Sequence, residues 1–265
     1  MSDTLNTVIL GIIEGITEFL PVSSTGHLLI AERWLGERSE LFNVTIQAGA
    51  ILAIVLIYWR RLLDLLTRFD RPENRDYLAK LTVAFLITAS GGFIATRLGW
   101  KLPETVLPVA LALLIGGILI FAIEHYVADR PASSTVTWTV AFWVGACQIL
   151  AAVFPGTSRS ASTIFAAMLA GLTLRPAATE FAFLVGIPTM FAATGYELLK
   201  VRSHGAGEED WHALAVGFVV SGVVAFIAVK WLLRYVQSHR FTLFAWYRVV
   251  VGAGLLALVW QGVLR

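Results

Sequence analysis

Charged residues are scarce in this sequence. Of its 265 residues, 14% are charged and 57% are hydrophobic. A water-soluble domain of this length carries about a quarter charged residues, which it needs to cover its surface. The composition therefore excludes a soluble fold. The net charge of +2 carries little information, because the placement of charges matters more than their sum.

Cysteine is nearly absent as well. The single residue, Cys147, lies inside an apolar run, so a disulfide framework and a cysteine metal cluster are both excluded, and a packing role is expected. The first residues lack Lys and Arg, and the first apolar stretch contains Glu14 and Glu18. No cleavable signal peptide is therefore expected.

Long apolar stretches are what the sequence has instead. The mean hydropathy is +0.76, and stretches of about 20 residues recur, each long enough to cross about 30 Å of hydrocarbon. We predict an all-α polytopic membrane protein. Its six transmembrane helices are predicted at about 42–59, 78–97, 104–126, 177–200, 211–237 and 242–264.

The distribution of basic residues predicts the orientation. The link after the first crossing contains the densest basic cluster, at residues 60–80, which places it in the cytoplasm by the positive-inside rule. Alternation then puts 127–135 and 238–241 inside, and 98–103, the acidic link 201–210 and both termini outside. Tryptophans near the predicted span ends anchor the helices at the interface, so no nucleic-acid partner is expected.

Two further segments, 4–36 and 136–172, are interrupted near their middles. Each contains a proline followed by hydroxyl residues, Pro21 in the first and Pro155 in the second. Proline cannot continue the preceding helix, and the hydroxyls can cap a new one. The resulting arms are too short to cross, so each segment is predicted to be a re-entrant helical hairpin.

The two hairpins form an internal repeat. With a shift of 134 residues, Gly11 falls on Gly145, Glu14 on Gln148, Pro21 on Pro155, Ser23 on Thr157 and Ser24 on Ser158. Each hairpin precedes three crossings, and an odd number leaves the second half inverted. We predict one integral membrane domain made of two inverted-topology repeats, 1–126 and 136–265. Such repeats place a polar site near mid-membrane.

Glu14 and Glu18 are the first candidate functional residues. They are four positions apart and share one face of an otherwise apolar helix. A buried carboxylate costs several kcal/mol, about 2.5–3.5 by insertion scales. One explanation is structural, with one carboxyl protonated and both hydrogen-bonded to a neighbouring helix. Binding of a divalent cation, Mg²⁺ or Ca²⁺, or acid–base work is the favoured explanation.

The two interruptions carry the other candidates. Ser23, Ser24 and Thr25 precede a helix start, with His27 in its first turn. Ordinary capping explains the hydroxyls, but a serine nucleophile with a histidine base, or a histidine nucleophile, fits as well. Arg159 begins the matching helix and needs an anion at this depth, either a glutamate or a phosphate. Because two helix N-termini also favour an anion, the set indicates phosphate chemistry on a lipid, with the metal offsetting charge.

Other polar residues are assigned supporting roles. Arg248, Lys230 and Glu124 are expected to snorkel or pair near span ends. Gln47 and Glu180 follow the hairpins and are candidates for supporting the site. The glycines at 91–92 and 116–117 are expected to be close-packing points between helices.

The motifs Glu14-Gly-Ile-Thr-Glu18-Phe-Leu-Pro-Val-Ser-Ser-Thr-Gly-His27 and Pro155-Gly-Thr-Ser-Arg-Ser-Ala-Ser-Thr163 resemble the signatures of the bacitracin-resistance type undecaprenyl-diphosphate phosphatases. The resemblance covers the whole chain in length, span number and motif order. It implies a hydrolase of the bacterial inner membrane that removes the terminal phosphate of undecaprenyl diphosphate. The product, undecaprenyl phosphate, is a lipid carrier recycled for cell-wall synthesis. A divalent cation and a site open to the periplasm are also implied.

By motif match, catalytic roles fall on Glu14, Glu18, Ser24, His27 and Arg159, with Glu14 and Glu18 as the metal ligands. The neighbouring polar residues of both turns are predicted to bind the substrate: Ser23, Thr25, Gly156, Thr157, Ser158 and Ser160. A second lipid phosphatase family shares the fragments Ser24-Thr25-Gly26-His27 and Ser158-Arg159. It requires a histidine after the arginine that this sequence lacks in the expected place, so that assignment is rejected.

Two other function classes compete. A transporter or flippase is the main rival, because inverted repeats with broken helices are a transporter architecture. A structural scaffold would leave the buried charges unexplained. The sequence leaves open whether Ser24 or His27 is the nucleophile, which metal binds, and whether the chain forms a homodimer among the membrane lipids.

Overall fold

The structure, a computed structural model, describes residues 3–99, 105–204 and 210–264. Within these ranges the chain forms eleven α-helices and no strand, which confirms the predicted all-α class. Six of the helices are long and apolar enough to cross a membrane. They are α3 (Glu40–Ile57), α5 (Pro72–Arg97), α6 (Val106–Ala128), α9 (Arg175–His204), α10 (Trp211–Ser238) and α11 (Thr242–Trp260). Of the predicted outer links, residues 100–103 and 205–209 fall outside the described residues, whereas residues 201–204 belong to α9.

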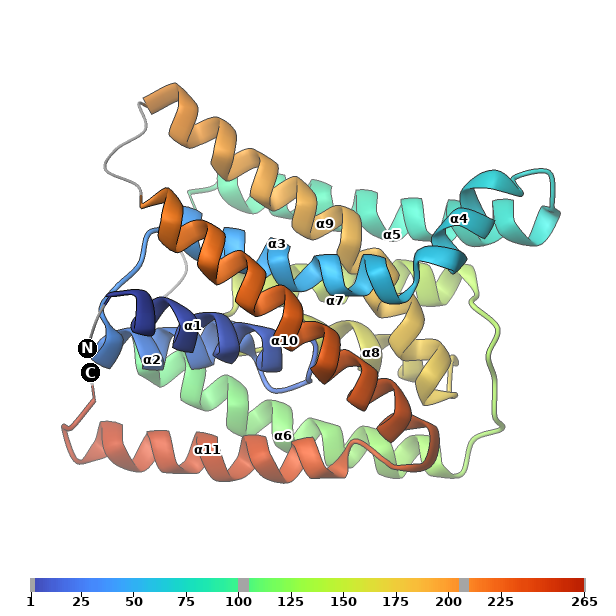
Figure 1. Cartoon of the computed structure of the whole chain (residues 1–265). Coiled ribbons are helices and arrows are strands. Elements are labelled where there is room, and N and C mark those ends of the chain that lie inside the picture. The colour runs from blue at the N-terminus through green and yellow to red at the C-terminus, as the bar shows by residue number, and fades with distance from the viewer. Residues whose placement is uncertain (1–2, 100–104, 205–209, 265) are drawn as a thin grey trace.

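The two interrupted segments are each divided into a pair of helices. The first pair is α1 (Asp3–Thr17) and α2 (Ser24–Leu35), and the second is α7 (Trp138–Val153) and α8 (Arg159–Leu169). At 1.5 Å per residue, each of these helices is shorter than the hydrocarbon core is thick. The members of each pair pack against each other (Figure 1). Both breaks fall where the sequence places a proline.

A serine caps the second helix of each pair. The Ser23 hydroxyl accepts a hydrogen bond from the Gly26 N–H (3.3 Å), and the Ser158 hydroxyl accepts one from the Ala161 N–H (3.2 Å). Both serines have positive φ, 76° and 70°, which is strained for a residue with a Cβ. The two caps are 135 residues apart, so the stretch from the proline to the cap is one residue longer in the second turn, from Pro155 to Ser158, than in the first, from Pro21 to Ser23. The pairing of Ser24 with Ser158 is therefore wrong, and the first residue of α2, Ser24, corresponds to the first residue of α8, Arg159.

Residues 60–77, predicted as a link, are partly helical. Helix α4 (Trp59–Thr67) follows α3 directly, and its residue Leu65 is fully buried. The amide of Asn74 donates to the carbonyls of Asp64 (3.0 Å) and Arg68 (3.1 Å), fastening α4 to the start of α5. Helix α5 also begins earlier than predicted, at Pro72, because proline suits the first turn of a helix.

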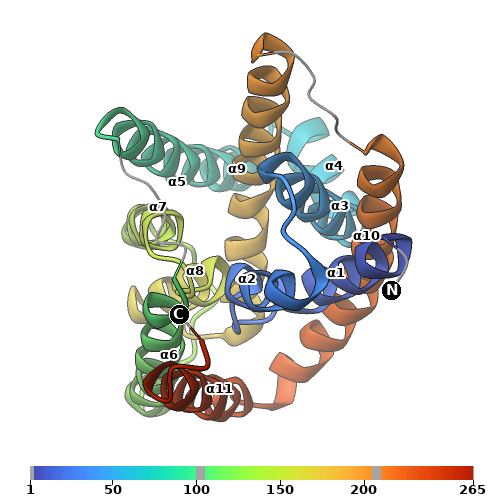
Figure 2. The same cartoon turned by 90° about the vertical axis from the view of Figure 1, so that its left-hand side faces the viewer.

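The long helices pack in pairs around the two breaks. Helix α6 lies along α11 and α3 along α10, as Figure 2 shows from the end that carries both termini. A Cβ added at Gly117 would meet the Ala245 carbonyl at 2.8 Å, so α6 and α11 touch backbone to backbone, as predicted. Gly91 is also a packing point, against Ile149, but Gly92 faces no atom within 4 Å, and its predicted packing role is wrong.

The buried charge of Glu124 has the ion-pair partner expected of it. Glu124 is 1% exposed and accepts hydrogen bonds from Arg175 (2.5 and 2.9 Å) and from the Phe241 N–H (2.9 Å). It therefore ties α6, α9 and the start of α11 together. The ammonium group of Lys230 lies 4.6 Å from the ring centroid of Phe226.

Candidate functional site

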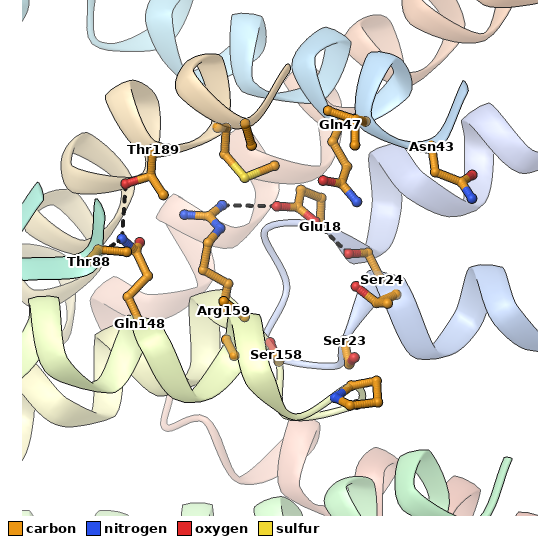
Figure 3. A pocket seen from close by; sticks show the side chains of 18 of the residues that line it. Glu18, Ser23, Ser24, Asn43, Gln47, Thr88, Gln148, Ser158, Arg159 and Thr189 are labelled. Atoms are coloured by element: carbon orange, nitrogen blue, oxygen red, sulfur yellow. Dashed lines mark hydrogen bonds and ion pairs between the residues drawn. The ribbon is translucent and has the colours of Figure 1, made fainter. Parts of the chain in front are cut away.

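A cavity of about 480 Å³ lies where the two turns face α3 and α9 (Figure 3). Its lining extends from exposed residues such as Glu40 to buried residues such as Gln148. The two turns meet directly here, because the Ser160 hydroxyl donates to the Leu20 carbonyl (3.0 Å). The cavity therefore sits between segments that are about half the chain apart in sequence.

The carboxylate of Glu18 is shared by the two turns. Its Oε2 accepts a hydrogen bond from the Ser24 hydroxyl (2.5 Å), and its Oε1 accepts one from Nη2 of Arg159 (3.0 Å). Glu18 is 7% exposed, so both bonds are largely shielded from water. Ser24 and Arg159 are the first residues of α2 and α8, so the first residue of the second helix in each pair contacts the same carboxylate.

Arg159 keeps donors free for a ligand. Its Nε and Nη1 are buried and have no hydrogen-bond partner among the described residues. The guanidinium carbon lies 5.9 Å from the ring centroid of Phe19, and Nη1 packs against Gly186 of α9. A planar guanidinium with unused donors is suited to a phosphoryl oxygen.

Glu14 is completely buried, and neither of its carboxylate oxygens has a hydrogen-bond partner in the described part of the chain. The structural explanation, a hydrogen bond to a neighbouring helix, is therefore not supported for Glu14. Helix α1 ends at Thr17, but the Glu18 N–H still donates to the Glu14 carbonyl (2.9 Å), so the two acids keep the predicted helical spacing.

A divalent cation fits this pair of acids. Hard cations take oxygen ligands, and Glu14 offers two bare ones beside Glu18. The described residues contain no cluster of three or more His, Cys, Asp or Glu. A cation held by Glu14 and Glu18 would therefore complete its shell with hydroxyl, water or phosphate oxygens, as Mg²⁺ commonly does.

The side chain of His27 points to α11. Its Nδ1 lies 2.7 Å from the Ser23 carbonyl and its Nε2 lies 2.6 Å from the Tyr247 hydroxyl. A carbonyl can only accept, so Nδ1 carries the hydrogen and Nε2 of the neutral ring accepts from Tyr247. The structure thus does not place His27 on the Ser24 hydroxyl, whose hydrogen goes to Glu18.

Most of the other predicted binding residues reach the cavity. Gln47 also lines it, whereas Glu180 forms an ion pair with Arg61 instead (3.5 Å). Four predicted site residues are not part of the lining: Glu14, His27, Thr157 and Ser160. The carbonyl of Thr157 and the hydroxyl of Ser160 are engaged in contacts within the protein. The predicted residues that line the cavity are Glu18, Ser23, Ser24, Thr25, Gly156, Ser158 and Arg159.

Arg248 is a residue whose role the sequence analysis missed. It was expected to snorkel or pair near a span end, but it is fully buried, and its guanidinium donates to five backbone carbonyls instead. That expectation is wrong. The acceptors lie on both turns and on α6: Pro21, Gly156 and Thr157, and Ala112 and Leu113. Arg248 therefore fastens the two turns to one another and to α6.

Comparison with known proteins identifies the family of the chain. The sequence model of the family described as bacitracin resistance protein BacA matches residues 7–254. A protein of Rhizobium etli named undecaprenyl-diphosphatase is 63% identical over 263 residues, covering 99% of each chain. One of the same name from Xanthomonas oryzae pv. oryzae is 58% identical over 257 residues, covering 97% of each. The chain, a multi-pass membrane protein with six apolar helices long enough to span, belongs to the bacitracin resistance protein BacA family.

Proposed function

We propose that this chain hydrolyses undecaprenyl diphosphate, releasing inorganic phosphate and undecaprenyl phosphate. The observation that carries the proposal is the sharing of Glu18 between a serine hydroxyl and an arginine. This arrangement supplies a nucleophile, an acceptor for its proton and a cation for the phosphoryl group. The name undecaprenyl-diphosphatase, carried by relatives about 60% identical over nearly the full length, supports the same reaction.

In the first step, the Ser24 oxygen attacks the terminal phosphorus. The hydroxyl proton moves to Glu18, which already accepts it at 2.5 Å. The bond between the terminal phosphorus and the bridging oxygen breaks, and undecaprenyl phosphate leaves. Arg159 would bind the transferring phosphoryl oxygens through the donors that lack a partner.

In the second step, water cleaves the phosphoserine. Glu18 first gives the Ser24 proton to the departing lipid phosphate, so its carboxylate can accept a proton from the attacking water. The bond between phosphorus and the Ser24 oxygen then breaks, Glu18 returns the proton to that oxygen, and inorganic phosphate is released. His27 holds the start of α2 against α11 through Ser23 and Tyr247, which fits a positioning role. The alternatives are attack by His27 and direct attack by a water molecule on the substrate. Trapping the phosphorylated intermediate distinguishes them.

Glu14 and Glu18 are the proposed holders of a divalent cation. A bound cation would offset the diphosphate charge and polarise the phosphoryl group. The bare, buried oxygens of Glu14 support this assignment, because an isolated buried carboxylate is costly without a proton or a counter-ion.

The two helix pairs are proposed to be re-entrant hairpins that begin two inverted repeats of the bacterial inner membrane. Matching helix breaks, matching serine caps and the packing of α1 on α10 and α7 on α5 support the repeat. The basic α4 region and the termini lie at opposite ends of the molecule (Figure 1). Because the exposed lining residue Glu40 begins α3 at the end where the termini lie, we expect the cavity to open to the periplasm.

A flippase is the weaker alternative. Broken helices and repeats suit transport, but transport has no need of a serine hydroxyl bonded to a carboxylate. Formation of a homodimer stays a prediction.

The proposal is tested by phosphate release from undecaprenyl diphosphate in detergent. The wild-type protein should release phosphate, and a chelator should stop release until Mg²⁺ or Ca²⁺ is restored. Ser24→Ala should lower turnover by about 10³-fold or more, because it removes the nucleophile. Ser238→Ala, at an exposed serine beyond the cavity, is the control.

Acid quenching of labelled substrate should trap phosphate on Ser24. Label on His27 would transfer the nucleophilic role to the histidine. Full activity of Ser24→Ala would remove the serine mechanism, and lipid movement across liposomes without hydrolysis would support the carrier.

A further inference from the structure

Gln148 of α7 lies in the cavity between two threonines. Its Nε2 is 2.9 Å from the Thr88 hydroxyl and 3.0 Å from the Thr189 hydroxyl. Each threonine hydroxyl has one hydrogen, and nearby carbonyls accept it. Thr88 donates to Ala84 or Gly145 and Thr189 donates to Val185, all at 3.0 Å.

These contacts fix the orientation of the amide. Because both threonine hydrogens are already donated, both hydroxyls must accept from Gln148, and only the NH₂ end of the amide can supply two hydrogens. Reversal of the amide would bring its oxygen against two acceptors. Oε1 is therefore held away from the threonines as a pure acceptor.

No donor in the described part of the chain reaches Oε1 of Gln148. Gln148 is 2% exposed, and its Oε1 has no hydrogen-bond partner in the described ranges. Gln148 and Arg159 line the same cavity, and Figure 3 shows their polar ends projecting into it near each other. Arg159 has the complementary need there, because its donors Nε and Nη1 have no acceptor among the described residues.

A ligand that satisfies both groups must be an anion that also carries a hydrogen. The anionic oxygens would accept from Arg159, and one hydroxyl hydrogen would be donated to Gln148 Oε1. A phosphoryl group with a P–OH has this combination. We propose that Gln148, oriented by Thr88 and Thr189, and Arg159 form an inner subsite for a monoprotonated phosphoryl group. The inference rests on the proposed function and deepens it.

The subsite should distinguish phosphate from sulfate. The two ions have the same tetrahedral shape, but sulfate carries no hydrogen at neutral pH. A sulfate oxygen would face the bare Oε1 as acceptor against acceptor, and a buried acceptor without a donor is costly. We expect phosphate to bind at least about tenfold more tightly, which corresponds to one hydrogen bond to a charged group.

The test measures binding of inorganic phosphate and of sulfate to the detergent-purified full chain by calorimetry. Gln148→Leu should bring the affinities for phosphate and sulfate to within about twofold of each other, mainly by weakening the binding of phosphate. Both threonine hydrogens still have carbonyl acceptors in this variant, so no donor is stranded. Gln237→Leu, at an exposed position of α10, is the matched control and should keep the full ratio.

Thr189→Val provides a second, independent change. With one of its two anchors removed, the amide is free to reverse, so the ratio should fall in this variant even though Gln148 is present. Equal binding of sulfate and phosphate by the wild-type protein, or an unchanged ratio in Gln148→Leu, would overturn the proposal.

The phosphoryl group has two sources, and kinetics distinguish them. If the subsite holds the terminal phosphate of the lipid, Gln148→Leu raises KM. If it holds released phosphate, the variant weakens product inhibition and leaves KM unchanged. If the chain hydrolyses undecaprenyl diphosphate but binds phosphate and sulfate equally well, only the subsite proposal fails. If it binds phosphate more tightly than sulfate but does not hydrolyse undecaprenyl diphosphate, only the proposed function fails.

Discussion

Arg159 is held at the residue scale by three different contacts. Glu18 accepts from Nη2, the Phe19 ring lies against the guanidinium, and Gly186 lets Nη1 approach the backbone of α9. A Cβ at Gly186 would collide with Nη1. Because Gly186 has no side chain, the guanidinium of Arg159 can occupy this position.

Gly186→Ala should displace Arg159 without touching its charge. We expect kcat/KM to fall by about 10–100-fold, since small misplacement of a phosphate-binding group is costly. Gly195→Ala in the same helix meets nothing within 4 Å and should leave activity and thermal stability near wild type. Arg159→Lys keeps the charge but loses the planar fork, and should lose at least as much activity. Wild-type kinetics for Gly186→Ala would show that Arg159 needs no such placement.

At the scale of elements, the two turns depend on one side chain. Arg248 of α11 bonds carbonyls on both turns and on α6, and a Cβ at Gly116 of α6 would collide with its guanidinium. Each stranded buried carbonyl costs about 1–3 kcal/mol. The separation between Ser24 and Arg159 is therefore expected to depend on Arg248, which touches neither.

Arg248→Met should lower melting temperature and turnover together. The milder Gly116→Ala should shift the guanidinium, lowering kcat by about tenfold with a smaller change in stability. Gly254→Ala, in the helix of Arg248 and facing open space, serves as the control. If Gly116→Ala retained full kcat, the turns would be shown to hold their geometry without Arg248.

The role of Arg248 had no signal in the sequence. Its partners are backbone carbonyls 91 to 227 residues away, and carbonyls are the same in every residue. The breaks at Pro21 and Pro155 were predictable because proline acts on its own helix. The extra residue between Pro155 and the cap Ser158, which pairs Ser24 with Arg159, became visible only when both caps were located.

At the scale of the whole molecule, the positions of the six long helices in the sequence followed from hydropathy, since each span is a local property of about 20 residues. Helix α4 was missed because its arginines were interpreted only as a cytoplasmic signal. The acids and arginine of the site were predictable from their depth in apolar segments. The direction of His27 was not, because it is set by Tyr247, 220 residues away.

The proposed inverted topology predicts opposite labelling of the two ends. Cysteines at Arg68 and at Gln261, in a Cys147→Ala background, should react with an impermeant reagent from opposite sides of the membrane. Both positions are exposed. Ser238→Cys should label with Arg68→Cys. Labelling of Arg68→Cys and Gln261→Cys from one side would contradict the topology.

Ser23 and Ser158 both sit at positive φ while capping α2 and α8. Glycine would relieve the backbone strain at either position, yet it would remove the capping oxygen and a hydroxyl beside the cavity. Selection for thermal stability and selection for turnover therefore favour different residues at these two positions. A search for stabilised variants would therefore be drawn to two positions beside the cavity, where a gain in stability is expected to come with a loss of turnover.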